Sequence, residues 1–216
     1  MKRVAFIVVG LISVSLLASV LSIVPGRDRL PCFHSDLRTG NWAAYCLLGR
    51  NYVREGAVDV ISEAHAEVET RHGPSPLTWL DASGPVNLPL WPHRSHTDGR
   101  QVDLSFYYVT LEGEPIPPPT FTGYFAYEPP EAGERQPCAP GSRPLDFGDP
   151  PQTRDWRWDE ARTTTLVQTL IGDERVRRIF LEPHLADRMA LTGHPKVRFA
   201  GCNAARHDDH IHIDLY

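Results

Sequence analysis

The C-terminal stretch of the chain, residues 207–216, reads HDDHIHIDLY. Within it, Ile211 and Ile213 alternate with His210 and His212. Because successive side chains of a β-strand point to opposite faces, this alternation predicts a strand that buries its isoleucines against a core. The two histidines then project together from the opposite face. The stretch therefore predicts a closing strand with one core face and one candidate site face.

A second group of histidines precedes another alternating stretch. Residues 92–103 read PHRSHTDGRQVD, and a Thr-Asp-Gly turn separates His96 from Asp103. The alternation of apolar and polar side chains over Val102–Tyr108 predicts a half-buried strand with Asp103 on its less apolar face. A turn at this point brings the side chains of His96 and Asp103 towards one ion.

The residue pattern in the rest of the chain predicts both helices and strands. It contains no internal repeat. Apolar residues at helical spacing, followed by Gly73 and Pro74, predict a helix over Ala57–His72. The other expected elements are a short strand and loop over Trp79–Trp91, a helix over Asp159–Ile171, a strand over Val176–Leu181 and a short helix over Pro183–Leu191.

The composition changes to proline and glycine between residues 113 and 152. Phe121, Tyr124, Phe125 and Tyr127 are interleaved with these residues. A loop of this length within a compact domain usually has a function. Its aromatic side chains are expected either to line a substrate groove or to pin the loop to the body of the domain.

The length and the charge of the chain limit its function. Its 216 residues are enough for one domain with a substantial core, and its formal net charge is −5. Lysines and arginines are scattered, so the chain lacks the clustered basic surface that binds a phosphate backbone. We therefore expect no nucleic-acid partner. The sequence points to no particular protein partner.

The N-terminal segment has the properties of a membrane anchor. Lys2 and Arg3 precede an uncharged apolar run over Val4–Val24. A helix needs ~20 apolar residues to cross the hydrocarbon core, more than a cleaved signal usually contains, which favours an uncleaved anchor. The positive charges before the run place the N-terminus in the cytoplasm and the remainder outside. Cleavage near Ala18 is the alternative, and it would release a secreted protein.

These features predict an extracytoplasmic domain, in the periplasm or cell envelope, anchored in the inner membrane. The predicted segments are a cytoplasmic tip (1–3), a transmembrane signal-anchor (4–24), a juxtamembrane segment (25–50) and a folded domain (51–216) that contains the proline-rich loop (113–152).

Four cysteines follow the apolar run, in the part of the chain that would meet an oxidising compartment. Disulfides are therefore expected, and four cysteines allow three connectivities. We favour Cys32 with Cys46 and Cys138 with Cys202, because the first two are close in sequence. None forms a Cys-x-x-Cys pair, so we do not expect a zinc site made from cysteines.

The clustered histidines and an aspartate predict a zinc site. Neutral imidazole nitrogens and carboxylate oxygens are usual ligands of zinc, and a catalytic site keeps three protein ligands with a water in the fourth position. The ion lowers the pKa of that water and polarises a scissile carbonyl, so amide hydrolysis needs no covalent intermediate. The sequence has no Gly-x-Ser-x-Gly motif that would supply a competing nucleophile. Another divalent metal is the alternative occupant.

The motifs resemble those of a known group of zinc proteins. Ser95-His96, Asp103 seven positions after that histidine, and His210-x-His212 far downstream are similar to the lysostaphin, D-Ala-D-Ala metallopeptidase and sonic hedgehog group. The resemblance implies that His96, Asp103 and His212 bind one Zn²⁺ per chain. It also implies that His210 is the nearby base or transition-state stabiliser.

Within that group, His93 and the closing stretch from His207 to His212 resemble the penicillin-insensitive murein endopeptidases. The resemblance extends more loosely from about Asp81 to the C-terminus, and the proline-rich loop is its weakest part. It implies that His93 and His207 complete the site. Related dipeptidases have a glutamate three residues before the last ligand, a position that Asp209 occupies here, so Asp209 is a rival base.

The resemblance implies an α+β fold in which an antiparallel sheet flanked by helices carries the zinc site, after the N-terminal anchor. It implies a zinc-dependent endopeptidase that hydrolyses the peptide cross-links of bacterial peptidoglycan. One alternative is a D-Ala-D-Ala carboxypeptidase or dipeptidase that uses the same zinc site. The other is a cell-wall binding module that contains zinc and does not catalyse.

Overall fold

The structure is a computed structural model that describes residues 10, 13–14, 24–91, 95–144 and 153–216. Most of the anchor predicted over residues 4–24 lies outside the described residues, and so does His93. Among the residues described, no helix is both long enough and apolar enough to cross a membrane.

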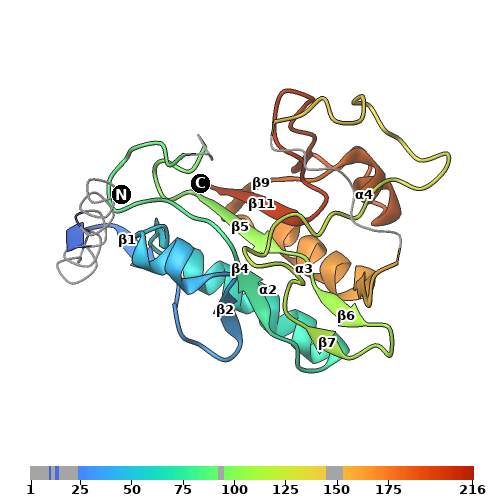
Figure 1. The fold of residues 1–216 in the computed structure, drawn as a ribbon. Helices are drawn as coiled ribbons and strands as arrows, with labels where there is room; N and C mark the ends of the chain where they lie inside the picture. Colours follow the sequence, from blue (N-terminus) through green and yellow to red (C-terminus); the bar gives the residue numbers. More distant parts are fainter. Residues whose placement is uncertain (1–9, 11–12, 15–23, 92–94, 145–152) are drawn as a thin grey trace, which may run out of the picture.

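A six-stranded mixed sheet forms the centre of the fold (Figure 1). In spatial order its strands are β10 (Val197–Arg198), β9 (Val176–Phe180), β11 (His210–Leu215), β5 (Gln101–Ser105), β4 (Leu77–Trp79) and β2 (Leu37–Thr39). Each of the four central strands is antiparallel to its neighbours among them, whereas β10 runs parallel to β9 and β2 runs parallel to β4. The antiparallel sheet that we expected is therefore confirmed at the centre only.

Two smaller sheets extend the fold. They comprise β1 (Arg27–Arg29) with β3 (Tyr52–Arg54), and β6 (Tyr108–Thr110) with β7 (Pro115–Ile116) and β8 (Trp156–Trp158). Segment 25–50, which we expected to precede the domain, contains β1, β2 and a short π-helix, η1 (Ala43–Leu47). Because β2 pairs within the large sheet and Leu37 is buried, this segment is part of the folded body and not a separate linker.

Two helices lie against each other behind the large sheet (Figure 1). Helix α2 covers Ala57–His72 as predicted, and α3 covers Glu160–Gly172, one residue later than predicted at each end. Asp159 caps α3, because its side chain accepts a hydrogen bond from a backbone N–H in the first turn. Helix α4 covers Pro183–Arg188 and ends before Leu191, where we had expected its end.

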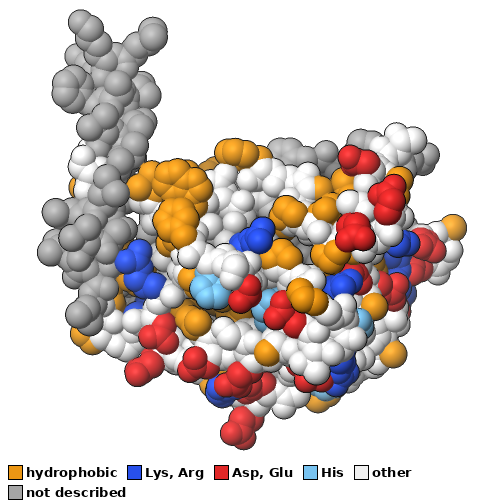
Figure 2. Space-filling view, turned by 90° about the horizontal axis from the view of Figure 1, so that it is seen from below, with side chains coloured by type: hydrophobic (Ala, Val, Ile, Leu, Met, Phe, Trp, Pro, Cys, Tyr) orange, Lys and Arg blue, Asp and Glu red, His pale blue; other side chains and the backbone are white. Residues whose placement is uncertain are grey.

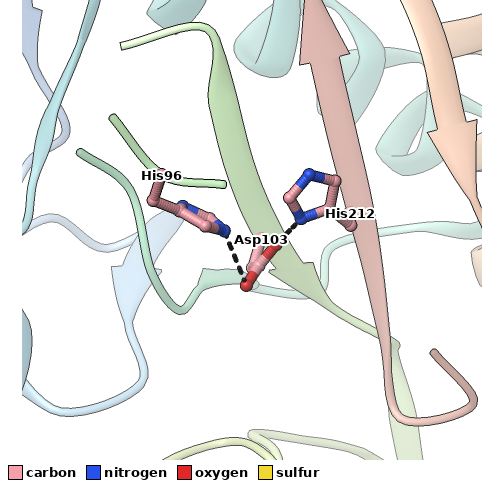
Figure 3. Close-up of side chains that lie close together, drawn as sticks. All are labelled: His96, Asp103 and His212. Carbon is pink, nitrogen blue, oxygen red and sulfur yellow. Dashed lines mark hydrogen bonds and ion pairs between the residues drawn. The ribbon is translucent and has the colours of Figure 1, made fainter. Parts of the chain in front are cut away.

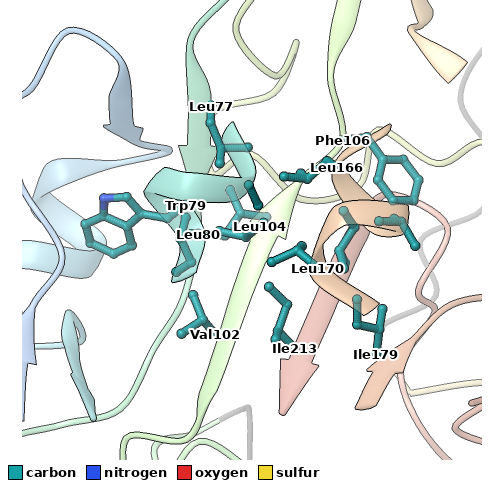
Figure 4. Close-up of a cluster of buried hydrophobic side chains, with 14 of the residues drawn as sticks. Leu77, Trp79, Leu80, Val102, Leu104, Phe106, Leu166, Leu170, Ile179 and Ile213 are labelled. Atoms are coloured by element: carbon teal, nitrogen blue, oxygen red, sulfur yellow. The ribbon is translucent and has the colours of Figure 1, made fainter. Parts of the chain in front are cut away.

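The core lies between these helices and one face of the large sheet (Figure 4). Val102 and Leu104 of β5 lie opposite Ile213 and Ile211 of β11, and all four side chains are buried. Leu170 of α3 packs in the same cluster. The residues that alternate with these apolar ones project from the other face of the same two strands.

The strand predicted over Val102–Tyr108 is divided in the structure. Strand β5 ends at Ser105, and Tyr108 begins β6 in another sheet. At the corner between them, the backbone N–H of Tyr107 donates to the Thr163 hydroxyl at 3.1 Å. Helix α3 thus supplies a hydrogen bond that a continuous ladder would otherwise provide.

Both disulfides form with the connectivity that we favoured, Cys32–Cys46 and Cys138–Cys202. They account for all four cysteines of the chain and fit an extracytoplasmic location. The second disulfide joins the proline-rich loop to the segment that precedes the C-terminal strand. It therefore ties the loop covalently to the chain just before β11.

Candidate metal centre

The register of two central strands places a histidine beside an aspartate. His212 of β11 lies opposite Asp103 of β5, and the two side chains project from the face that does not carry the core. His212 Nδ1 is 2.7 Å from Asp103 Oδ1. His96, from the turn before β5, approaches the other carboxylate oxygen, with Nε2 3.3 Å from Oδ2 (Figure 3).

These three residues form a group that can hold a metal ion. One ligand atom from each of His96, Asp103 and His212 lies within 4.8 Å of the others, and all three residues are buried. Two imidazoles and one carboxylate are a donor set that zinc uses in catalytic sites, where a further position stays open to water or substrate. Across the ranges that the structure describes, this is the one group of three or more such side chains that meets the distance criterion. The expected ligand set is therefore brought together.

The charge of Asp103 suits a cation. Burial by itself would raise the pKa of this carboxyl, but the surrounding histidines outweigh that effect and hold its pKa well below the ordinary value. His96 and His212 make the largest of these contributions. Asp103 is consequently ionised at neutral pH and presents negative oxygens to the position between the two imidazoles.

A tight turn holds His96 against the body of the protein. Gly99 has a φ of +83°, and its N–H donates to Ser83 Oγ at 2.9 Å. Its carbonyl accepts from the backbone N–H of Arg54 at 2.7 Å. A Cβ atom at position 99 would lie 2.9 Å from Arg54 N and 3.1 Å from the carbonyl carbon of Val53, so only glycine fits without displacement.

A Gly99→Ala substitution is expected to weaken metal binding by roughly tenfold or more, because the displaced turn carries a ligand. Zinc titration of the purified protein with a competing chelator would measure the change. Gly56→Ala is a matched control, since Gly56 has a similar φ of +81° and no atom near its would-be Cβ. Equal zinc affinity in the two variants would show that the turn does not position His96.

His210 lies beside the candidate metal ligands, on the same face of β11 as His212. Its Nε2 is 3.9 Å from Asp103 Oδ2, and its Nδ1 is 2.5 Å from Asp209 Oδ1. A carboxylate can only accept, so Nδ1 carries the proton in that bond. Burial opposes a charge on His210, but Asp209 and Asp103 outweigh burial and raise its pKa to about 9. The imidazole is thereby oriented with Nε2 towards the metal position.

The carboxylate of Asp209 is engaged through both oxygens. Oδ1 binds His210, and Oδ2 accepts from the backbone N–H of Phe125 at 2.5 Å. Phe125 has a positive φ of 72°, which is rare for a residue with a bulky side chain. Asp209 therefore joins His210 to the proline-rich loop. This arrangement favours His210 over Asp209 as the residue that reaches a substrate.

His207 completes a cluster of rings around the site. Its ring centroid lies 4.9 Å from that of His210 and 5.8 Å from that of His212. Burial and these two neighbouring histidines hold the pKa of His207 well below the ordinary value, so it is neutral at pH 7. Its Nδ1 is buried and has no hydrogen-bond partner among the described residues. His93, the other residue that we expected to complete the site, lies outside them.

A buried ion pair supports the backbone of His207. The His207 N–H donates to Glu182 Oε1 at 3.1 Å, and the Glu182 N–H donates to the carbonyl of His207 at 3.2 Å. Arg143 of the proline-rich loop donates to both oxygens of the same carboxylate, at 2.5 and 2.9 Å. The loop therefore stabilises the segment that leads into β11. No local sequence pattern predicts this pair, because its members are 39 residues apart in the chain.

Tyr124 is a second contribution of the loop to the site. Its hydroxyl donates to Asp103 Oδ2 at 2.5 Å, and its ring lies edge-on to that of His210, with 4.9 Å between the centroids. We had expected the loop aromatics either to line a groove or to pin the loop. Tyr124 does both. Its hydrogen bond to Asp103 pins the loop to β5, and its side chain also lines the groove described next.

A groove of ≈ 290 Å³ opens beside His210. Its walls are mainly apolar and include the aromatic rings of Tyr45, Trp91, Phe125 and Tyr127. On one face of the molecule, histidine and acidic side chains lie among hydrophobic ones (Figure 2). A groove with apolar walls and a few polar groups at one end is the usual form of a small-molecule or peptide site.

A comparison of the chain with models of known protein families gives no match, and a comparison with curated proteins gives none either. The functional argument that follows is therefore drawn from the geometry of the metal centre and from the motifs in the sequence.

Proposed function

We propose that the protein is a zinc-dependent endopeptidase that hydrolyses amide cross-links of bacterial peptidoglycan, like the murein endopeptidases that its motifs resemble. The observation that carries this proposal is the buried group of His96, Asp103 and His212, with His210 beside it lining a groove. A metal that only stabilises the fold would use a fourth protein ligand, whereas three ligands suit a catalytic ion.

The chemistry divides between the ion and the side chains around it. A bound zinc supplies Lewis acidity, which polarises the scissile carbonyl and makes water nucleophilic at neutral pH. Asp209 holds His210 through Nδ1, so that Nε2 points towards the metal ligands. Because the pKa of His210 is raised to about 9, its Nε2 carries a proton at neutral pH and would donate a hydrogen bond to the oxygen that gains negative charge. A bound cation would lower this pKa, and the neutral imidazole would then accept a proton from the attacking water instead.

The location of the protein supports such a substrate. Two disulfides fit an oxidising compartment, in which peptidoglycan is also found. We further propose that the apolar run over residues 4–24 anchors the chain in the inner membrane with the described domain outside.

Mass spectrometry of murein products tests this function. Purified full-length protein is incubated with murein and with dimeric muropeptides, with a chelator, and again after zinc is restored. We expect conversion of dimers to monomers that stops with the chelator and returns with zinc. This result would establish metal, substrate and bond together.

Other products would support the alternatives. Release of free alanine from peptides that end in D-Ala-D-Ala would indicate a carboxypeptidase at the same site. Absence of any product, with one zinc bound per chain, would indicate a binding module and contradict the proposal.

A further inference from the structure

Three exposed aromatic side chains gather in a second hollow of the surface. Phe33, Trp42 and Phe121 line a depression of ≈ 550 Å³ and are 84%, 53% and 85% exposed. The ring centroids of Phe33 and Trp42 are 6.2 Å apart. A contiguous group of exposed apolar side chains usually marks an interaction surface. We call these three residues the aromatic platform.

The aromatic platform is held in place by covalent and polar contacts beneath it. The Cys32–Cys46 disulfide closes the loop that carries two of its rings. Asn41 Nδ2 donates to the carbonyl of Phe121 at 3.2 Å, and the Tyr45 hydroxyl donates to the carbonyl of the next residue at 2.8 Å. The third ring is thus tied to the same loop. A platform that is already ordered loses little conformational freedom when it binds a ligand.

The aromatic platform adjoins the groove beside His210. Ala43 lines the hollow of the platform, and its neighbour Ala44 lines the groove beside His210. Likewise, Phe121 lines the hollow of the platform, and its neighbour Thr122 lines the groove. The two hollows therefore lie next to each other, so an extended ligand could contact both.

The two hollows differ in what they offer a ligand. The groove is lined by His210, which lies next to the candidate metal ligands, whereas the platform has exposed ring faces together with the polar side chains of His34, Arg38 and Asn41. A pyranose ring matches this surface, because its C–H faces pack on aromatic rings while its hydroxyl and acetamido groups lie at the rim. A flat lipid surface or a second copy of the chain would match the rings but would not use the hollow or its polar side chains.

We propose that the aromatic platform binds sugar rings of a glycan strand whose attached peptide enters the groove at the metal centre. This inference rests on the proposed function, since peptidoglycan is a polymer in which a glycan carries the cross-linked peptides. The platform then recognises the polymer, and the metal centre acts on its peptide.

Calorimetric titration with peptide-free murein glycan strands tests the inference. The full-length protein in detergent is compared with Trp42→Ala and Phe121→Ala variants. We expect the wild type to bind and each variant to bind roughly tenfold more weakly, because each loses one ring face. Trp42→Phe keeps an aromatic face and is expected to retain most of the binding. Leu111→Ala is the control, since Leu111 is exposed but lines neither hollow.

Three results would overturn the inference. The first is absence of glycan binding by the wild type, and the second is equal binding by the wild type and the platform variants. The third is that the same substitutions instead reduce binding to phospholipid vesicles or self-association in sedimentation experiments, which would assign the platform to a bilayer or to a second copy.

A parallel assay on sugar-free peptide dimers separates this inference from the proposed function. Zinc-dependent cleavage without glycan binding would support the proposed endopeptidase and contradict the role of the platform in glycan binding. Glycan binding that depends on Trp42 and Phe121, without any cleavage, would support the role of the platform and contradict the proposed endopeptidase.

Discussion

A His210→Ala variant is expected to fold and to bind zinc, but to hydrolyse murein cross-links about 10²- to 10⁴-fold more slowly than the wild type. The reason is that His210 lies next to the three ligands without belonging to them, with Nε2 3.9 Å from Asp103 Oδ2. Its loss removes a proton-transferring or hydrogen-bonding group and leaves the ligand set intact. Turnover of dimeric muropeptides, followed by chromatography, would measure the effect.

Zinc content and circular dichroism of the same variant show whether the metal and the fold are retained. His194→Ala is a control, because His194 lies outside the cluster and accepts a hydrogen bond from the Lys196 N–H. Full activity of the His210 variant would contradict the role that we assign to this residue. If an Asp209→Ala variant then lost activity while His210→Ala did not, Asp209 would be the base.

The elements predicted best are those whose signals are local. The helix over Ala57–His72 has apolar residues at helical spacing and is followed by Gly73, and both of its ends were predicted correctly. The C-terminal strand was predicted because its alternation continues without interruption from His210 to Leu215. In both segments one face is buried against the core, so the sequence pattern and the tertiary packing agree.

The elements that were missed depend on partners far away in the chain. Strand β2 is three residues long, and its place beside β4 depends on pairing across more than thirty residues. The break after β5 was not visible because the alternation of residues continues into β6 while the backbone changes sheet. The hydrogen bond from Tyr107 to Thr163 that accompanies this corner joins positions 56 apart in sequence.

The same distinction applies to the site. His96, Asp103, His210 and His212 were identified because they occur in two short groups that strand alternation can orient. Tyr124 was noted only as one aromatic residue among several in the loop. The support that Arg143 and Glu182 give to the segment before β11, through His207, requires three segments to be placed together, and no local pattern encodes that.

An Asp103→Ala variant is expected to lose stoichiometric zinc binding and, with it, all measurable cross-link hydrolysis. Asp103 is the one carboxylate of the ligand group, and its two oxygens lie 2.7 Å from His212 Nδ1 and 3.3 Å from His96 Nε2. Its removal takes away a ligand and also the charge that orients both imidazoles. We expect zinc affinity to fall by more than the roughly 10- to 100-fold that loss of an outer-shell partner costs.

Equilibrium dialysis against zinc, with metal analysis of the protein, would measure this loss. Ser105→Ala is a matched control, because Ser105 lies on the same strand and face and its hydroxyl donates to the neighbouring carbonyl of Phe106. The control distinguishes loss of a ligand from disturbance of β5. If Asp103→Ala kept one zinc per chain with unchanged affinity, the ion would be bound elsewhere, and both the ligand assignment and the proposed endopeptidase mechanism would have to be abandoned.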